Sequence, residues 1–206
     1  MRELRATARP GKGDVLVQVM ADAAAAFAAG DYRDAIRLAD QGKHLALRAA
    51  TVRELLGLAL YRAGRWRDAA RELAAFRRLS GTVEQNPVLA DCYRALGRPE
   101  RALELCDELQ GRAVAPGIAY EGAIVAAGAL VDLGRHDDAV ARLEALDLDP
   151  EVAEEHHVRA WYVLGDLLER RGRFTQAREL FEAVAGVDDE LTDAAERAAR
   201  LGPRAR

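Results

Sequence analysis

Four histidines are the side chains of this sequence best suited to proton transfer or metal binding. They are scattered along the chain, at His44, His136, His156 and His157. Histidines that act together on zinc in a protease lie four positions apart on one helix, as in HExxH. Here the adjacent pair follows Glu154 and Glu155, an order that does not match that motif. We therefore expect no metal ligand and no catalytic residue among the histidines.

A lysine between two glycines, in the segment RPGKGD at residues 9–14, invites comparison with a phosphate-binding loop. A loop of that kind follows a strand, has wider glycine spacing, and carries Ser or Thr after the lysine to hold magnesium. None of these conditions is met here. The sequence thus disfavours nucleotide binding and predicts no cofactor.

The two cysteines and the paired acids also have a structural interpretation. Cys92 and Cys106 are fourteen residues apart, and no second pair completes a zinc site. We expect both thiols to be small side chains in the core. Pairs such as Asp137 with Asp138 stand where helices should start, and there they favour the helix dipole. The sequence therefore predicts a protein that is not an enzyme.

Composition favours a folded, helical protein. Of the 206 residues, 50% are hydrophobic and 31% are charged, whereas aromatic residues reach only 5%. The abundant alanine, leucine, arginine and glutamate lose little side-chain freedom in helices. The start of the sequence lacks the apolar core of a signal peptide, and no run approaches the roughly 20 apolar residues that cross a bilayer. We expect a cytoplasmic protein without a membrane partner.

A phrase of about nine residues recurs five times along the chain. Its copies are AAGDYRDAI, RAGRWRDAA, ALGRPERAL, DLGRHDDAV and RRGRFTQAR. Their glycines, which are 34, 33, 37 and 38 residues apart, are Gly30, Gly64, Gly97, Gly134 and Gly172. A glycine that ends a helix adopts the left-handed conformation without steric cost. We predict that each glycine ends one helix and that the next helix begins two residues later.

Side-chain size follows the same register, which predicts how the two helices of each pair pack. Five residues after each glycine stands an alanine: Ala35, Ala69, Ala102, Ala139 and Ala177. Seven residues before each glycine the residue is again small: Ala23, Gly57, Ala90, Ala127 and Gly165. Small residues at both sites allow two helices to cross closely. Four residues before each glycine the residue is bulky except in the first copy: Ala26, Leu60, Tyr93, Leu130 and Leu168.

Residues 160–184, AWYVLGDLLERRGRFTQARELFEAV, resemble a tetratricopeptide repeat, and so do residues 53–76. Residues 87–105 also resemble uncharacterised repeat proteins of high-GC bacteria. The resemblance implies an all-α fold, a right-handed superhelical solenoid of about five helix hairpins with a C-terminal capping helix. The expected organisation is a flexible segment, a repeat domain and a frayed tail, at residues 1–13, 14–201 and 202–206. The expected repeats are 16–49, 50–82, 83–119, 120–157 and 158–187, followed by a capping helix at 189–201.

In this family the first helices of the repeats line a concave groove, which the resemblance makes the candidate site for a peptide or helix of a partner protein. The twelve predicted groove residues are Phe27, Glu54, Leu58, Tyr61, Asp91, Arg94, Glu121, Ile124, Val131, Arg159, Tyr162 and Asp166. The acids among them disfavour a clamp for a terminal carboxylate. The predicted groove is then one that takes apolar side chains of a helix or extended peptide, with its acids selecting basic residues beside them. Two alternatives stay open: these side chains only solvate the inner wall, or the convex face is the binding surface.

Charge is unevenly distributed, and this suggests a second class of function. Residues 1–80 hold 15 Lys and Arg against 9 Asp and Glu, whereas residues 81–206 hold 15 against 25. A strip of Arg65, Arg67, Arg71, Arg77 and Arg78 is therefore an alternative site, for nucleic acid in a regulatory factor. Missing aromatic partners, the interrupting acids Asp68 and Glu72, and a net charge of −4 disfavour that alternative. Self-association is left open. The main prediction is a protein-binding scaffold or adaptor.

Overall fold

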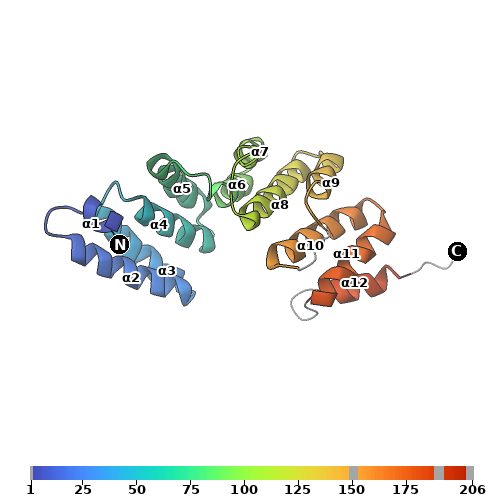
Figure 1. Ribbon diagram of the computed structural model, residues 1–206, viewed down its shortest axis with the longest axis horizontal. Coiled ribbons are helices and arrows are strands. Elements are labelled where there is room, and N and C mark those ends of the chain that lie inside the picture. The colour runs from blue at the N-terminus through green and yellow to red at the C-terminus, as the bar shows by residue number, and fades with distance from the viewer. Residues whose placement is uncertain (1, 149–152, 188–192, 203–206) are drawn as a thin grey trace. The chain divides into compact units, whose positions relative to one another are not determined.

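The structure, a computed structural model, describes residues 2–148, 153–187 and 193–202. Within these residues every regular element is an α-helix, as predicted for the fold class (Figure 1). The helices are α1 (Arg2–Thr7), α2 (Gly13–Ala28), α3 (Tyr32–Leu45), α4 (Ala50–Arg62), α5 (Trp66–Ser80), α6 (Asn86–Ala95), α7 (Pro99–Asp107), α8 (Pro116–Asp132), α9 (His136–Glu144), α10 (Glu155–Arg170), α11 (Phe174–Val187) and α12 (Ala194–Arg200).

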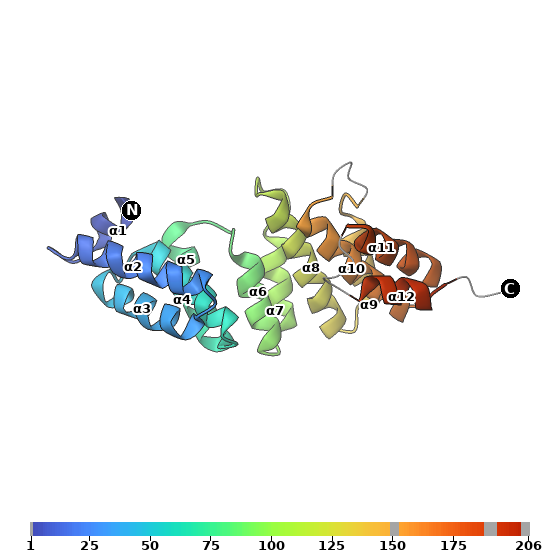
Figure 2. The same ribbon diagram turned by 90° about the horizontal axis from the view of Figure 1, so that it is seen from below.

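The chain divides into two compact units, unit 1 at Met1–Leu105 and unit 2 at Cys106–Arg206. In unit 1 the hairpins α2/α3 and α4/α5 lie side by side, with α3 packed on α4 and α5 packed on α6 (Figure 2). In unit 2, α10 packs against α8, α9 and α11, and α11 packs against α12. Successive helices therefore pack in chain order within each unit, as tetratricopeptide hairpins do. No helix among the described residues is long and apolar enough to cross a membrane.

The recurring glycines end helices as predicted. Gly30, Gly64, Gly97, Gly134 and Gly172 have φ between 69° and 78°. After each one, the next N–H donates back to the carbonyl oxygen of the residue four before the glycine, as from Arg65 to Leu60 at 2.9 Å. This hydrogen bond satisfies a carbonyl at the helix end that has no partner inside the helix. The following helices all begin two residues after the glycine.

The predicted small residues lie where the helices of each hairpin cross. All five alanines that follow the glycines are fully buried. A Cβ added to Gly57 would lie 2.7 Å from Leu73 Cγ, and one added to Gly165 would lie 2.9 Å from Phe181 Cε1. Leu73 and Phe181, which belong to the second helices of those hairpins, are fully buried. The hairpins therefore owe their close approach to these small side chains.

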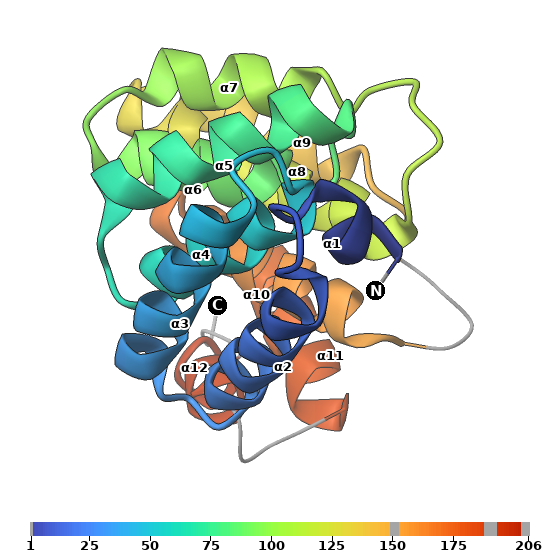
Figure 3. The same cartoon turned by 90° about the vertical axis from the view of Figure 1, so that its left-hand side faces the viewer.

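Helix α1 lies within the segment that the sequence analysis expected to be flexible. It lies beside α2 (Figure 3), and Leu4 is buried in a cluster with Leu16, Met20 and Val52. The Glu3 carboxylate accepts hydrogen bonds from the Ala50 N–H, at 2.7 Å, and from the Thr51 hydroxyl. A carboxylate at the first turn of a helix stabilises its unsatisfied N–H groups. Helix α1 thus covers the start of the array and caps α4.

Several helices start at positions that differ from the predicted repeat boundaries. Helix α6 begins at Asn86 with Pro87 in its first turn, where the missing N–H costs no hydrogen bond. Helix α8 begins at Pro116, four residues before the boundary expected for the fourth repeat. Helix α12 lies inside the expected capping helix 189–201. Residues 149–152, 188–192 and 203–206, which include parts of the predicted fourth repeat, capping helix and tail, lie outside the described residues.

Candidate partner-binding site

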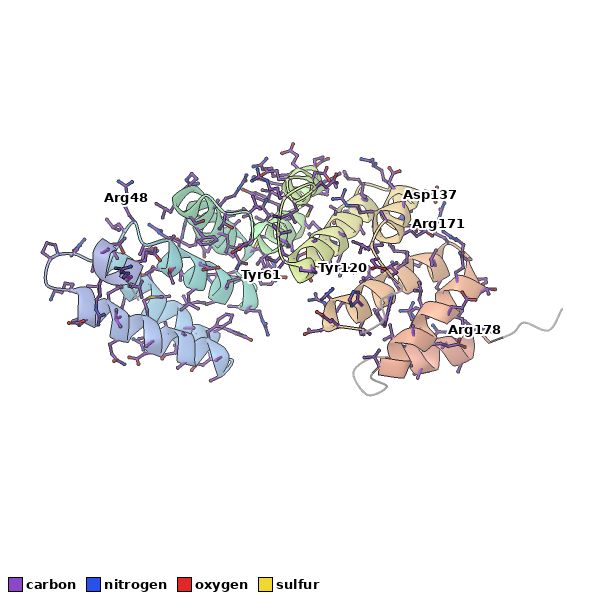
Figure 4. The ribbon with its side chains drawn as sticks, in the orientation of Figure 1. Arg48, Tyr61, Tyr120, Asp137, Arg171 and Arg178 are labelled. Atoms are coloured by element: carbon purple, nitrogen blue, oxygen red, sulfur yellow. The ribbon has the colours of Figure 1, made fainter. Side chains whose placement is uncertain are left out.

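The predicted groove residues of unit 1 lie on α2, α4 and α6, and all six are partly exposed. We call this surface the first-helix face of unit 1: Phe27, Glu54, Leu58, Tyr61, Asp91 and Arg94. At its centre the Tyr61 hydroxyl donates to Asp91 Oδ2 at 2.8 Å, and Arg94 Nη1 donates to Asp91 Oδ1 at 3.1 Å. Figure 4 labels Tyr61 near the end of α4. These three residues are thus joined across two neighbouring first helices.

The remaining residues of this face flank that centre. The Glu54 carboxylate accepts a hydrogen bond from Gln85 Nε2 at 2.8 Å. Phe27 packs edge-on against Tyr32, with ring centroids 5.6 Å apart, and Tyr61 packs edge-on against Trp66 at 5.3 Å. The face therefore carries aromatic rings, held by the first residues of the following helices, beside carboxylates that already have partners in the chain.

In unit 2 the predicted residues lie on α8 and α10. Arg159 Nη1 and Glu121 Oε2 form an ion pair at 2.9 Å. Ile124 is half-buried on α8. Val131 lines a cleft of about 160 Å³ together with His136, Leu167, Arg170 and Arg171. Beside it, Arg171 pairs with Asp137, and both are labelled in Figure 4.

Tyr162 and Asp166 are covered by the chain's own α12. The guanidinium group of Arg197 donates to Asp166 Oδ1 at 2.8 Å and to the Tyr162 hydroxyl at 3.3 Å. It also pairs with Glu169 and lies 4.3 Å from the centre of the Phe181 ring. The Arg197 side chain is 11% exposed. This part of the predicted groove is therefore in contact with the chain's own α12, and the sequence does not predict that contact.

The pKa directions of Arg197 and Glu169 agree with this ion pairing. Burial alone would lower the pKa of Arg197, but its hydrogen bonds to Asp166 and Glu169 raise that pKa above its ordinary value. The hydrogen bond from Arg197 lowers the pKa of Glu169. The pKa of Tyr162 is raised, chiefly because its hydroxyl donates to Asp193 Oδ1 at 2.7 Å. Arg197 is thus held as a cation between two carboxylates.

Unit 1 holds a second buried ion cluster, which lies outside the predicted groove. The Glu72 side chain on α5 is only 2% exposed. Its carboxylate pairs with Arg53 Nη1 at 2.5 Å and with Lys43 Nζ at 3.4 Å. Burial would raise the pKa of Glu72, but the hydrogen bond from Arg53 and the charge of Lys43 lower it overall. The cluster ties α3, α4 and α5 together.

The arginine strip proposed for nucleic acid is only partly available. Arg65 Nη2 pairs with Asp68 Oδ2 at 2.7 Å, and Arg71 pairs with Asp68 at 3.5 Å and with Glu72 at 3.4 Å. Arg67, Arg71 and Arg78 of the strip line one cleft on α5, whereas Arg65 lines another cleft together with Asp68. Tyr93 and Arg98 line that cleft too, so an aromatic ring that the sequence analysis did not find accompanies the arginines.

The histidines and cysteines form no metal cluster among the described residues, and several of them are buried. Within the part of the chain that the structure describes, no cluster of three or more His, Cys, Asp or Glu residues is suited to a metal ion. His157 is buried, and its Nδ1 accepts a hydrogen bond from the Glu154 N–H at 2.9 Å at the start of α10. Cys92 and Cys106 are buried thiols that form no disulfide, as predicted for core side chains. Burial, together with the charge of Asp91, raises the pKa of the Cys92 thiol to about 12.

Residues 55–117 and 124–206 match the family model described as tetratricopeptide repeat. A thermophilic TPR protein of Thermus thermophilus is similar in structure, with a TM-score of 0.67, 16% identity, and coverage of 90% of this chain and 98% of that one. YrrB, described as a TPR protein with an unusual peptide-binding site, has a TM-score of 0.56 and 18% identity over 86% and 89% of the two chains.

The quorum sensor NprR of B. thuringiensis, in its apo form, has a TM-score of 0.73 and 11% identity, covering 90% of this chain and 57% of that one. At these identities the likeness concerns the fold. No curated protein matches the sequence.

Proposed function

The chain belongs to the tetratricopeptide repeat family, and from that premise we propose that it is a scaffold or adaptor. In this proposal the first-helix face of unit 1 holds a basic peptide or helix of a partner protein, and the chain catalyses no reaction. The proposed compartment is the cytoplasm. Members of the family generally act in protein–protein interaction, which supports the class of function. The choice of face and the charge of the partner rest on the side chains described above.

The observation that carries the proposal is the binding of Arg197 in unit 2. There a helix presents an arginine to the first helix of a repeat, and two carboxylates and two aromatic rings hold its guanidinium group. Arginine is suited to such a site because its planar group pairs with carboxylates and stacks on rings. The chain thus contains an example of the ligand chemistry that we propose for unit 1.

Unit 1 offers corresponding groups, because Tyr61 on α4 and Asp91 on α6 lie together on the first-helix face. Tyr61 and Asp91 are partly exposed, and the Arg94 and Asp91 side chains that form the neighbouring ion pair are 27% and 28% exposed. A partly exposed pair of this kind is worth only about 0–1 kcal/mol. A basic side chain of a partner can therefore compete with Arg94 for the Asp91 carboxylate, since this ion pair itself contributes little. Leu58 and Phe27 supply apolar contacts on the same face.

The test compares matched tyrosines of the two units by crosslinked pull-down from the native cell. We expect Tyr61→Ala to reduce recovery of the partner about tenfold, the size of effect typical of a central aromatic contact. Tyr162→Ala is the control, because Arg197 already covers that ring. Circular dichroism would verify that both variants stay folded.

A second variant tests the charge of the partner without removing a ring. Asp91→Asn keeps the shape of the side chain but removes its negative charge, so binding of a basic partner should weaken at least about tenfold, the lower end of the worth of a hydrogen bond to a charged group. If the wild type, Tyr61→Ala and Asp91→Asn recover the same partners equally, the assignment of this face is wrong. Loss of binding in Tyr162→Ala alone would move the site to unit 2.

A further inference from the structure

We propose that unit 1 has a second binding site, a cleft rich in arginine that takes an acidic segment of a partner protein. We call it the arginine cleft. It has a volume of about 380 Å³ and is lined by Arg67, Arg71, Arg78, Tyr93, Leu96 and Arg98. None of these residues belongs to the first-helix face of unit 1, and the ligand has the opposite charge. The proposal therefore goes beyond the function proposed above.

A neighbouring cleft shows how the arginine cleft differs from an ordinary charged surface. That cleft, of about 390 Å³, lies between α3 and α5 and also has Arg71 on its wall. Its cations have carboxylate partners beside them: Arg65 pairs with Asp68, and Lys43 pairs with Asp40 at 2.6 Å. The arginine cleft has four arginines and no acidic residue in its lining. Its positive charge is thus not neutralised from within.

Three of the four arginine side chains are free to bind. The guanidinium groups of Arg67, Arg78 and Arg98 form no ion pair or hydrogen bond with any residue that the structure describes. The Arg71 side chain, whose contacts are the long ones to Asp68 and Glu72, is 68% exposed. An arginine without a partner binds a carboxylate through two parallel hydrogen bonds. Several such arginines around one cleft favour a ligand with several carboxylates.

The floor of the cleft is apolar and shallow, which favours a polypeptide as the ligand. Ala70 and Ala74 lie between the arginines of α5, and their small side chains allow close approach of another chain. Tyr93 is half-buried, whereas Leu60, Leu130 and Leu168 at the same position of other repeats are buried. The Tyr93 hydroxyl has no hydrogen-bond partner among the described residues. Its ring and hydroxyl therefore remain available to a ligand.

Spacing and charge decide between an acidic peptide and nucleic acid. Arg67, Arg71 and Arg78 follow one side of α5, and the rise of a helix places the first and last about 16 Å apart. A peptide with acidic and apolar side chains matches both this row and the apolar floor. Nucleic acid would leave the alanine floor without a matching group and would meet a chain of net charge −4. The observations therefore favour the acidic peptide.

The experiment uses the full chain and a fluorescein-labelled synthetic peptide rich in glutamate and leucine, about 12 residues long, in fluorescence anisotropy. We expect the Arg67→Ala, Arg78→Ala double variant to raise the Kd at least about tenfold, because each arginine–carboxylate pair contributes to binding. Arg33→Ala with Arg48→Ala is the matched control. It removes the same charge from exposed sites of unit 1 outside the cleft, and it should change the Kd less than about twofold.

A single variant from another element checks the geometry. Arg98→Ala, in the turn between α6 and α7, should also weaken binding, because Arg98 lines the same cleft as the arginines of α5. The proposal is overturned if the wild type does not bind the peptide, or if the cleft and control variants weaken binding equally. It is also overturned if a single-stranded RNA of similar charge binds more tightly than the peptide and loses affinity in the same variants.

Discussion

The two units bury their strongest ion clusters in different places. In unit 1 the buried group is an acid, Glu72 on α5, which pairs with Arg53 on α4 and with Lys43 on α3. In unit 2 the buried group is a base, Arg197, which Asp166 and Glu169 surround on the first helix of the last repeat. The repeats are the same in kind, but the second cluster covers predicted groove residues and the first does not.

This difference shows that a repeat does not by itself leave its first-helix face open. Tyr61 and Tyr162 both belong to the predicted groove and lie on the first helices of their hairpins. Tyr61 contacts Asp91 and Trp66, whereas Tyr162 also lies under the guanidinium group of Arg197. The helix that follows a repeat therefore adds side-chain contacts to the first-helix residues of that repeat.

The largest expected effect tests the ion cluster of unit 1. Glu72→Ala leaves Arg53 and Lys43 without their buried partner, and breaking such a pair costs about 3 kcal/mol. Urea denaturation should show this decrease in the free energy of unfolding. Glu104→Ala is the control, because that exposed acid pairs with Arg101 at the surface and should change stability by less than about 0.5 kcal/mol. Equal losses would show that Glu72 does not hold unit 1 together.

Substitutions at the helix crossings of the two units should reduce the free energy of unfolding by smaller amounts. In Gly57→Ala the new methyl group would meet both the side chain and the backbone nitrogen of Leu73, the latter at 3.2 Å. Overpacking of this kind costs about 2 kcal/mol after the better helix propensity of alanine is counted. In Gly165→Ala the three atoms nearest the new group all belong to the Phe181 ring, so we expect a loss of about 1 kcal/mol.

Gly186→Ala provides the control for these two substitutions, with the same chemical change in a helix. Apart from its chain neighbours and the backbone of its own helix, no atom lies within 4 Å of the Cβ that would be added there. Thermal denaturation should show a gain of up to about 1 kcal/mol from helix propensity. A loss at Gly186 as large as that at Gly57 would contradict the packing explanation.

Removing the ion cluster of unit 2 should reduce stability locally, by an amount similar to or smaller than that of the glycine substitutions. Arg197→Ala removes the group that joins α12 to α10, and we expect a loss of about 1–2 kcal/mol because the cluster is only partly buried. Amide hydrogen exchange in residues 194–200 should accelerate more than exchange in α8. Arg200→Ala, which removes a side chain 60% exposed, is the control. Unchanged exchange in the Arg197 variant would mean that α12 does not depend on this arginine.

The pH dependence of stability should distinguish the same clusters. The pKa values of Glu72 and Glu169 are lowered in the folded chain. A lowered folded pKa stabilises the protein above the ordinary value, and this contribution disappears as the pH falls below about 4. The stability difference between wild type and Glu72→Gln should therefore shrink below that pH, as should the difference for Glu169→Gln. A difference that grows in acid would reverse the assigned direction.

The fold could be predicted from the sequence more completely than the candidate site could. Each glycine phrase contains a helix end, the start of the next helix and the small residue at the crossing, so local residues specify each hairpin. Helix α1 escaped prediction because its capping contact joins Glu3 to Ala50, which are far apart in the sequence. The predicted groove residues lie on first helices as expected, but their use by a partner stays a prediction.

The Arg197 contact and the arginine cleft, which most affect the candidate sites, both depend on side chains from different helices. Arg197 reaches Asp166 across 31 positions, and nothing in the local pattern of α12 assigns it that contact. The arginine cleft forms because α5 and the end of α6 bring Arg67 and Arg98 to one opening. A tyrosine where other repeats have leucine was the available sequence signal, but its exposure depends on packing.

The two buried cysteines allow local opening of the helices around them to be measured by alkylation. Cys92 lies in unit 1 and Cys106 is the first residue of unit 2. A buried thiol, protonated at neutral pH in the case of Cys92, does not react with iodoacetamide until its surroundings open. The alkylation rates of the two thiols under native conditions therefore record how often α6 and the end of α7 open, without any introduced label.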